Sequence, residues 1–400
     1  MFRRNFTPAG IVIGAIVAVF FSVHAFPQSR SPFPIDVTVG PAPQLFMVDG
    51  RARLSYELHF TNFAPFKIEL TSIDVLDDTE TPLATYRADA LEKMVVPAER
   101  VVVWADPPKG APPAREIVEG HTAVIFFDVA LDPGAHAPAK LRHRFSFTFA
   151  GSNGATVARS LDGPAVSVVQ QTTTVLRPPL RGASWIAFNA FSNGGSPDHR
   201  RAFNAIDSRI YDAQRFAIDW ARLGPDGRLF HGDSKSNANF YGYGAEVVAV
   251  ADGRISDLKD NLPDNVGSND RAKRVITLDN ALGNSVTIDL GNGHFAIYGH
   301  LQPGSLKVKL GDTVKTGQVL ALLGNSGNSD GPHLHFQLTD ANSPLASEGI
   351  PYEIETFTQL DVLKNSSVLD DGSAWQPKPG TKPIVRRREF PIDNAVITFP

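Results

Sequence analysis

Short stretches in which apolar and polar residues alternate are the feature that most restricts how this chain can fold. Between Ile35 and Gln170 they include ARLSYELHFTNF, KIELTSIDVLD, TAVIFFDVAL and LRHRFSFTFA, and turn-forming clusters such as DDTETP and DPGAHAP separate them. Alternation with a period of two is typical of β-strands that bury one face. Several such strands at this spacing predict an immunoglobulin-like β-sandwich over residues 35–172. Four scattered histidines in this region are interpreted as structural: His59, His121, His136 and His143.

A second β-rich region is expected after residues 173–185, a segment with two prolines and a glycine that we interpret as a linker. Long strand-like runs mixed with Gly- and Asn-rich turns predict an antiparallel β-core over residues 186–350. Within it, Gly291-Asn292-Gly293 separates two alternating runs and predicts a hairpin. The insertion 198–243 is expected to be loop with one short helix. The C-terminal extension 351–400 is expected to pack on a domain as edge strands.

The N-terminus has the pattern of a secretory signal peptide. Arg3 and Arg4 precede an apolar run from Ile11 to Val23, and Ala25 ends a small-residue cleavage site. The run is shorter than the roughly 20 residues that a membrane span needs. We expect removal of residues 1–25 and no membrane span in the mature chain, with an uncleaved N-terminal anchor as the alternative. In both cases the chain is expected to be exported, as a periplasmic or secreted protein.

The composition excludes several kinds of site and partner. The chain has no cysteine, so disulfides and thiolate metal sites are excluded, and any metal must be held by His, Asp or Glu. A formal net charge of -4 over 400 residues gives no electrostatic basis for binding nucleic acid. An exported chain without cysteine fits a bacterial envelope better than an oxidising eukaryotic lumen.

The candidate site starts from His333 and His335 in GPHLHF, which project from the same face of a predicted strand. Alone, this pair is equally compatible with a metal site and with a solvated strand edge. His300 in YGHL, His199 in DHRRAF and Asp219 in RFAID complete the candidates. A catalytic zinc site needs three protein ligands, commonly imidazoles and a carboxylate, together with an unligated base near the bound water. Four histidines and one carboxylate satisfy this requirement.

The ordered motifs VVAVADGRI, VTIDLGNGHFAIYGHL and VKLGDTVKTGQVLALLGNSGNSDGPHLHFQL resemble the lysostaphin/LytM-type zinc metallopeptidases, over roughly residues 195–345. Members of this family cut peptide cross-links in bacterial cell walls. The resemblance implies a compact antiparallel β-core with a groove across it, and a bound zinc ion. It also implies that Asp219 and His335 are zinc ligands and that His300 and His333 are the catalytic imidazoles.

The sequence departs from the family pattern at one ligand. The H-x-x-x-D pair of the family falls on RFAID, where Arg215 occupies the histidine position. An arginine stays protonated and has no lone pair for a metal. We expect His199 to replace it, because this residue begins the segment that leads to Asp219. His231, in LFHGDS, is the alternative, and a site that has lost a ligand is the third possibility.

Two functions of different classes are compatible with these residues. The first is a zinc-dependent endopeptidase that hydrolyses peptide cross-links of peptidoglycan. His199, Asp219 and His335 would bind zinc, His333 would take a proton from the attacking water, and His300 would hydrogen-bond the oxyanion. The second is a non-catalytic peptidoglycan-binding or hydrolase-activating module that has lost a zinc ligand.

Two further expectations concern the rest of the chain. VKLGDTVKTGQVL resembles lipoyl and biotinyl carrier domains, but the corresponding hairpin tip has no lysine, so a carrier function is disfavoured. The N-terminal domain is expected to orient or partly cover the peptidase groove, and it is the expected contact region for an envelope protein partner.

Overall fold

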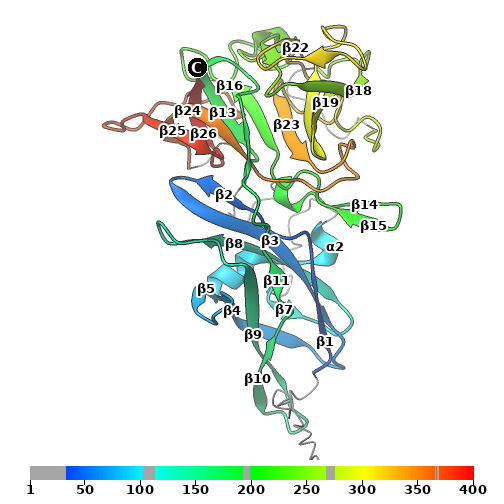
Figure 1. Cartoon of the computed structure of the whole chain (residues 1–400), viewed down its shortest axis with the longest axis vertical. Helices are drawn as coiled ribbons and strands as arrows, with labels where there is room; N and C mark the ends of the chain where they lie inside the picture. Colours follow the sequence, from blue (N-terminus) through cyan, green and yellow to red (C-terminus); the bar gives the residue numbers. More distant parts are fainter. Residues whose placement is uncertain (1–32, 102–112, 192–198, 267–274, 365, 367–368) are drawn as a thin grey trace, which may run out of the picture. The chain divides into compact units, whose positions relative to one another are not determined.

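A computed structural model describes residues 33–400 except 102–112, 192–198, 267–274, 365 and 367–368. The predicted signal peptide, residues 1–25, lies outside the described residues. The described part is mainly β-structure in predominantly antiparallel sheets, as predicted (Figure 1). Within it, no helix has the length and apolar character that crossing a membrane requires.

Two antiparallel sheets form the N-terminal region. One has the order β1-β3-β8-β6 with β2 paired to β3, and the other has the order β10-β9-β4-β5 with β7 and β11 paired to β4 and β9. The elements are β1 (Ile35–Val39), β2 (Leu45–Val48), β3 (Arg51–Asn62), β4 (Ile68–Leu76), β5 (Pro82–Arg87), α1 (Asp89–Met94), β6 (Val95–Pro97), α2 (Ala98–Val101), β7 (Glu116–Ile117), β8 (Thr122–Ala130), β9 (Lys140–Ala150), β10 (Thr156–Asp162) and β11 (Val166–Ser167).

The two sheets pack face to face through aromatic side chains. Burial alternates residue by residue along the first part of β9, as a period-two pattern requires. The Tyr56 hydroxyl on β3 hydrogen-bonds His143 Nε2 on β9 at 2.7 Å, and the rings of Phe60 and Phe145 lie 5.2 Å apart. This arrangement is a β-sandwich. Its immunoglobulin-like topology remains a prediction, whereas His143 is buried within the sandwich.

The C-terminal region is organised around one large sheet. Its strand order is β12-β24-β26-β13-β16-β23-β20-β19-β18-β21, with β25 paired to β24. The strands are β12 (Thr174–Leu176), β13 (Gly182–Phe188), β16 (Ile218–Arg222), β18 (Gly253–Lys259), β19 (Asn284–Gly291), β20 (His294–Leu301), β21 (Thr313–Val314), β23 (Leu334–Thr339), β24 (Tyr352–Val362), β25 (Ile384–Glu389) and β26 (Ala395–Phe399).

Smaller elements surround this sheet. They are the 3₁₀ helices η1 (His199–Arg201) and η2 (Asn237–Asn239), and the strand pairs β14 (Asn204–Ile206) with β15 (Arg209–Tyr211) and β17 (Glu246–Val248) with β22 (Val319–Leu322). The hairpin predicted at 291–293 joins β19 to β20, with Gly291 opposite His294. Asn292 and Gly293 both have positive φ, as a two-residue turn of this kind requires. The insertion 198–243 contains η1, β14, β15, β16 and η2, which is more regular structure than the predicted loop with one short helix.

The ends of the large sheet correct two expectations. The segment 173–185 contains β12 and the start of β13, so much of it belongs to the sheet. The C-terminal extension does pack on this region, but β26 lies inside the sheet between β24 and β13, whereas an edge position was expected. The apolar run AVITF is almost wholly buried, and a continuous apolar run suits a strand that is covered on both faces.

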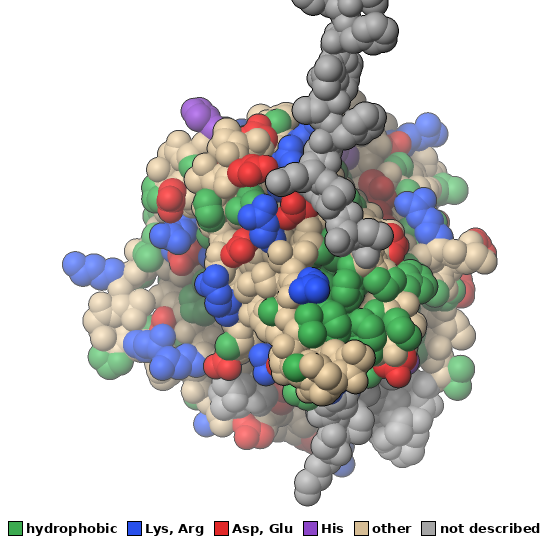
Figure 2. Space-filling model, turned by 90° about the horizontal axis from the view of Figure 1, so that it is seen from below, with side chains coloured by type: hydrophobic (Ala, Val, Ile, Leu, Met, Phe, Trp, Pro, Cys, Tyr) green, Lys and Arg blue, Asp and Glu red, His purple; other side chains and the backbone are tan. Residues whose placement is uncertain are grey.

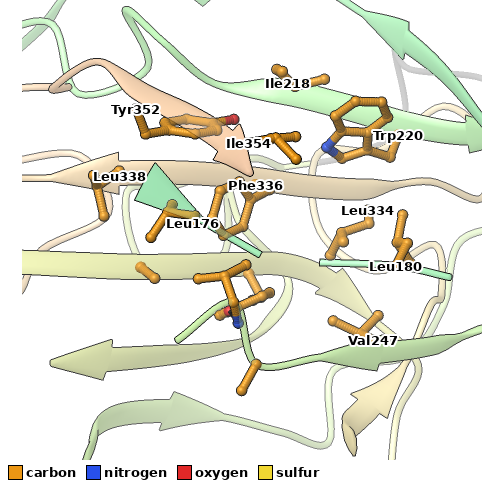
Figure 3. Packing of buried hydrophobic residues seen from close by; sticks show 14 of the residues in the cluster. Leu176, Leu180, Ile218, Trp220, Val247, Leu334, Phe336, Leu338, Tyr352 and Ile354 are labelled. Atoms are coloured by element: carbon orange, nitrogen blue, oxygen red, sulfur yellow. Dashed lines mark hydrogen bonds between the residues drawn. The ribbon is translucent and has the colours of Figure 1, made fainter. Parts of the chain in front are cut away.

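Alternate side chains of β23 point into the apolar core of this region. Leu334, Phe336 and Leu338 contact the apolar cluster that includes Trp220 and Tyr352 (Figure 3). The residues between them therefore point to the opposite side of the sheet, because side chains alternate along a strand. Those residues include His335, so the alternation that builds the core also directs this imidazole toward the candidate site.

The charged surface is mixed. On the face drawn in Figure 2, cationic and anionic side chains are interspersed and hydrophobic side chains gather in one area. This face carries no broad region in which charged side chains of one sign predominate, in keeping with the small net charge.

Residues Pro34–Pro400 form one compact unit.

Candidate metal centre

Asp219 and His335 are brought together by strand register. Strand β16 pairs antiparallel with β23, and Asp219 lies directly opposite His335. Opposed residues of antiparallel strands place their Cβ atoms about 4.5–5.5 Å apart, close enough for side chains to meet. The imidazole Nδ1 lies 2.9 Å from the Asp219 Oδ1, and both residues are buried. The sequence-based pairing of these two candidates therefore has a direct geometric basis.

His199 reaches the same point from outside the sheet. It lies in η1, and its Nε2 is 3.3 Å from the Asp219 Oδ2. One potential ligand atom from each of His199, Asp219 and His335 falls in a group whose members all lie within 4.8 Å of one another. Among the described residues this is the one such group. His231, the alternative candidate, is exposed and its ring contacts Tyr241 instead.

His300 is held in a strained backbone conformation at the end of β20. Its φ is 59°, which is uncommon for a residue other than glycine; such a conformation costs on the order of 1–3 kcal/mol and persists only where surrounding contacts impose it. Its backbone N–H donates to the Leu282 carbonyl, and its Nδ1 donates to the Ser326 carbonyl, both at 2.8 Å. The Nδ1 hydrogen bond fixes the ring, so Nε2 is the nitrogen left for chemistry.

His333 is held in a similar way just before β23. Its Nδ1 donates to the Gly331 carbonyl at 2.8 Å, and its Nε2 lies 3.4 Å from the Asp219 Oδ1. The rings of His333 and His300 are 4.7 Å apart. Two imidazoles with tethered Nδ1 atoms therefore stand next to the cluster of potential ligands, which is the arrangement that acid–base chemistry needs.

Two polar side chains that the sequence analysis missed orient the potential ligands. Asn189 Nδ2 donates to the Asp219 Oδ2 at 2.8 Å, and Gln337 Oε1 accepts from His335 Nε2 at 2.7 Å. The second contact leaves His335 Nδ1 as the lone-pair nitrogen facing Asp219. Gln337 was recognisable in principle, because it follows His335 by two positions on the same strand face. Nothing local in the sequence singles out Asn189.

The environment of the site favours an ionised Asp219 carboxylate and neutral imidazoles at His300 and His335. Burial would raise the pKa of Asp219, but the neighbouring imidazoles of His199 and His333 hold it well below its usual value. Burial lowers the pKa of His300 and of His335. Burial also acts to lower the pKa of His333, but the Asp219 carboxylate outweighs it and the net shift is upward. A metal requires a deprotonated carboxylate and an imidazole lone pair, so Asp219 and His335 lie near the protonation state that binding needs.

These residues open into one cleft of about 810 Å³. A cleft of this size is in the range of about 300–1,000 Å³ typical of ligand sites. Its walls combine the five candidate residues with aromatic and aliphatic side chains, namely Phe188, Leu229, Phe230 and Phe240.

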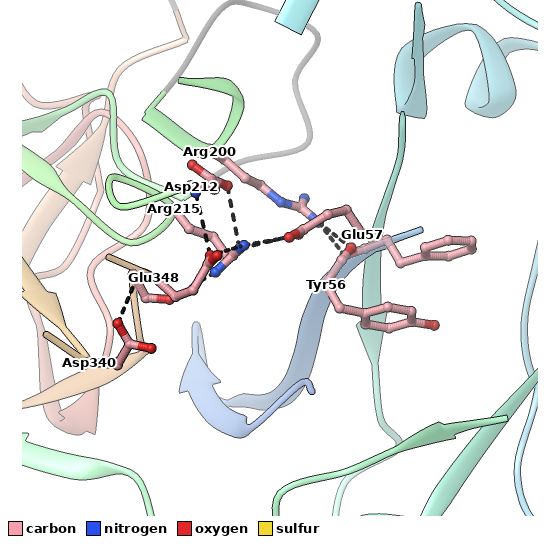
Figure 4. A network of polar contacts seen from close by, with 9 residues as sticks. Tyr56, Glu57, Arg200, Asp212, Arg215, Asp340 and Glu348 are labelled. Atoms are coloured by element: carbon pink, nitrogen blue, oxygen red, sulfur yellow. Dashed lines mark hydrogen bonds and ion pairs between the residues drawn. The ribbon is translucent and has the colours of Figure 1, made fainter. Parts of the chain in front are cut away.

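Arg215, which occupies the histidine position of the family pattern, points away from this cleft. Its guanidinium hydrogen-bonds both oxygens of Glu57 on β3, and it pairs with Glu348 at 3.0 Å and with Asp212 at 3.4 Å (Figure 4). These groups line a separate cavity of about 460 Å³. The arginine is therefore part of a buried ion-pair network.

The comparisons with known proteins agree with the resemblance over part of the chain. Residues 238–347 match the family model of peptidase family M23. The matched segment contains His300, His333 and His335, and it confirms the predicted resemblance to lysostaphin/LytM-type peptidases over this part of the chain. His199 and Asp219 precede the matched segment.

Individual relatives match over similarly limited lengths. The chain is 32% identical to Endolysin 2638A of Staphylococcus phage 2638A over 131 residues, which are 27% of each protein. It is 38% identical to the peptidoglycan DD-endopeptidase ShyA of Vibrio cholerae over 84 residues, 19% of each protein. The match thus spans about a quarter or less of these relatives. Among solved structures, the catalytic domain of lysostaphin from Staphylococcus simulans aligns with 32% of this chain and 86% of its own, at 23% identity and a TM-score of 0.20.

Proposed function

We propose that this protein is a zinc-dependent endopeptidase that hydrolyses peptide cross-links of bacterial peptidoglycan. The observation that carries the proposal is the convergence of His199, Asp219 and His335 beside His300 and His333 in one cleft. The family match supports a peptidase, and relatives that act on peptidoglycan support this class of substrate.

The three potential ligands fit a zinc ion. Zinc ligands in a tetrahedron, at about 2.0–2.1 Å from the metal, lie about 3.3 Å from one another. The Asp219 Oδ2 lies 3.3 Å from His199 Nε2 and the Oδ1 lies 2.9 Å from His335 Nδ1, and one ligand atom from each of the three residues lies within 4.8 Å of the others, so the group is close to the size of a zinc site. Two imidazoles and one carboxylate are a common donor set for catalytic zinc. Bound there, zinc would supply a Lewis acid that polarises the scissile carbonyl and acidifies a water molecule.

The two remaining histidines divide the proton chemistry. Each has its Nδ1 committed to a backbone carbonyl, so each works through Nε2. His333 is assigned as the base that takes a proton from the attacking water, because its Nε2 lies 3.4 Å from the ligand Asp219. His300 is assigned as the donor to the oxyanion; because its Nδ1–H is committed to Ser326, this role requires a second proton on Nε2, which the negative charge of the oxyanion would favour. The proton that His333 takes from the water would pass to the leaving amine when the tetrahedral intermediate breaks down.

Export follows from the substrate and the N-terminal sequence together. Peptidoglycan lies outside the cytoplasm, and the first 25 residues have the charged start and apolar run of a secretory signal peptide. We therefore place the mature protein in the periplasm or outside the cell. A non-catalytic wall-binding module, the alternative, was motivated by Arg215. The ion pairs of this arginine and the 3.3 Å approach of His199 to Asp219 support the enzyme over this alternative.

The test is digestion of purified peptidoglycan by the full-length mature protein loaded with zinc. We expect newly formed peptide ends at the cross-links, detected by mass spectrometry, with intact glycan strands. Asp219→Ala should abolish the release, whereas His231→Ala, which changes an exposed histidine, should cleave as the wild type does. Bound zinc without any cleavage would favour the non-catalytic module, and new reducing sugar ends would contradict the reaction type.

A further inference from the structure

The segment that supplies His199 is held by the N-terminal sandwich. η1 has three residues, too few to be stable by itself. Asp219 and His335, by contrast, sit on paired strands inside the large sheet. The position of His199 must therefore be fixed by the contacts of the residues next to it.

Arg200, the residue after the potential ligand, is buried against the sandwich. Its Nη2 donates to the carbonyl oxygens of Tyr56 on β3 and Phe127 on β8, two residues that face each other in the strand register. Its guanidinium lies 5.5 Å from the Phe126 ring centroid and 4.9 Å from that of Phe191. The side chain is 1% exposed. An arginine buried this deeply, with backbone acceptors on two strands, has little freedom to move.

The next residues extend the same attachment. Arg201 Nη2 donates to the Lys93 carbonyl at the end of α1, at 2.6 Å. Phe203 is buried in a cluster with Val124 and Phe126 of β8. Each of these contacts is made to the sandwich, so the turn that carries His199 is fastened to the N-terminal region at several points.

Arg215 makes a second connection beside the first. It binds Glu57, and Glu57 follows Tyr56, whose carbonyl accepts from Arg200 (Figure 4). Two adjacent residues of β3, Tyr56 and Glu57, thus contact Arg200 and Arg215. Through Arg200 the strand β3 supports the position of His199, and through Arg215 it supports the segment that leads to Asp219.

We propose that the sandwich completes the metal centre, with Arg200 as the positioning residue that sets His199 against Asp219 and His335. The inference rests on the proposed zinc function and extends it, because it makes metal binding dependent on the N-terminal domain. In this arrangement the domain acts as a structural part of the site. Displacement of the sandwich would remove a ligand and leave the other two in place.

The test measures zinc affinity of the full-length mature chain by competition with a chromophoric chelator. Arg200→Met should weaken zinc binding about 10–100-fold, the usual range for residues that orient ligands. Arg200→Lys, which retains a charged donor, should recover part of the loss. Arg254→Met removes another arginine–carbonyl hydrogen bond, from Arg254 to Gly311 on the far part of the large sheet, and should leave the affinity unchanged.

A double-mutant cycle separates positioning from general destabilisation. The His199→Ala chain keeps two of the three potential ligands, so it should lose its zinc on purification but still bind the metal weakly when zinc is added in excess. In that background Arg200→Met should cause no further loss of affinity, because its effect passes through the missing imidazole. An additional full loss in that background, or wild-type affinity in Arg200→Met itself, would overturn the inference while leaving the zinc function intact. A wild-type chain that binds no zinc would overturn both. If circular dichroism shows that Arg200→Met is unfolded, Arg200→Lys and Arg201→Met decide: both should bind zinc more weakly, and unchanged affinity in both would overturn the inference.

Discussion

The guanidinium of Arg215 binds the carboxylate of Glu57, a residue 158 positions earlier in the chain. The pair joins the sandwich strand β3 to the turn that leads into β16, and both side chains are buried. The position that the family pattern assigns to a metal ligand therefore serves an ion pair here. His199, the proposed replacement for the missing donor, approaches the Asp219 carboxylate from a different element.

The identity of the third ligand can be decided by metal content. We expect about one zinc per chain in the wild type and in His231→Ala, and loss of zinc in His199→Ala, because His199 lies 3.3 Å from Asp219 whereas His231 is exposed. Atomic absorption on the purified proteins gives the answer. Loss of zinc in His231→Ala alone would identify His231 as the ligand and refute the proposed role of His199.

Removal of the proposed base should separate chemistry from metal binding. His333→Ala is expected to lower the cleavage rate about 10²–10⁴-fold, since a general base contributes roughly that factor, while zinc content stays at the wild-type level. Parallel assays of peptidoglycan cleavage and zinc content test this. His335→Ala provides the matched comparison, because removal of this potential ligand should lower both the cleavage rate and the zinc content. A zinc-free His333→Ala would show that this histidine is a ligand.

The buried ion pair should be costly to break from one side. Arg215→Met leaves Glu57, Asp212 and Glu348 buried without their cation, and removal of one partner from such a network typically costs about 3–5 kcal/mol. Chemical denaturation should show this loss in the free energy of unfolding. Arg254→Met, on an exposed strand position, should change stability by no more than about 0.5 kcal/mol. Equal stabilities of the two variants would mean that the network contributes nothing.

Stability should depend on pH through His143 in the sandwich core. Burial lowers the pKa of this residue to about 4 from the unfolded value of 6.5. As the pH falls below 6.5 the unfolded chain takes up a proton that the folded chain resists, so the contribution of neutral His143 is complete above 6.5 and is lost towards pH 4. The full effect is about 3 kcal/mol, at about 1.4 kcal/mol per unit.

His143→Gln provides the control for this effect. Glutamine can still accept the Tyr56 hydroxyl hydrogen bond but does not titrate. The free energy of unfolding, measured by denaturation between pH 4 and 7, should therefore fall less steeply in the variant, by about 1–3 kcal/mol over the range. Identical slopes in the two proteins would contradict the assignment.

The sequence by itself determined the elements that depend on local pattern. Alternation of apolar and polar residues predicted the β-rich fold and the hairpin at 291–293, because side chains alternate across a strand and turn residues need positive φ. The same rule placed His335 on the polar side of β23, and the ordered motifs pointed to the M23 region and to Asp219 and His335 as a pair.

The tertiary structure decided what depends on residues distant in sequence. No local pattern shows that Arg215 pairs with Glu57, that Asn189 orients Asp219, or that β26 inserts into the middle of the large sheet. The approach of His199 was expected, but its cause was not visible, since η1 has no periodicity and depends on sandwich contacts made by Arg200. The side of a strand to which a side chain points is determined by the alternation of residues along that strand. The position of a short turn such as η1 is determined by contacts with residues that are distant in the sequence.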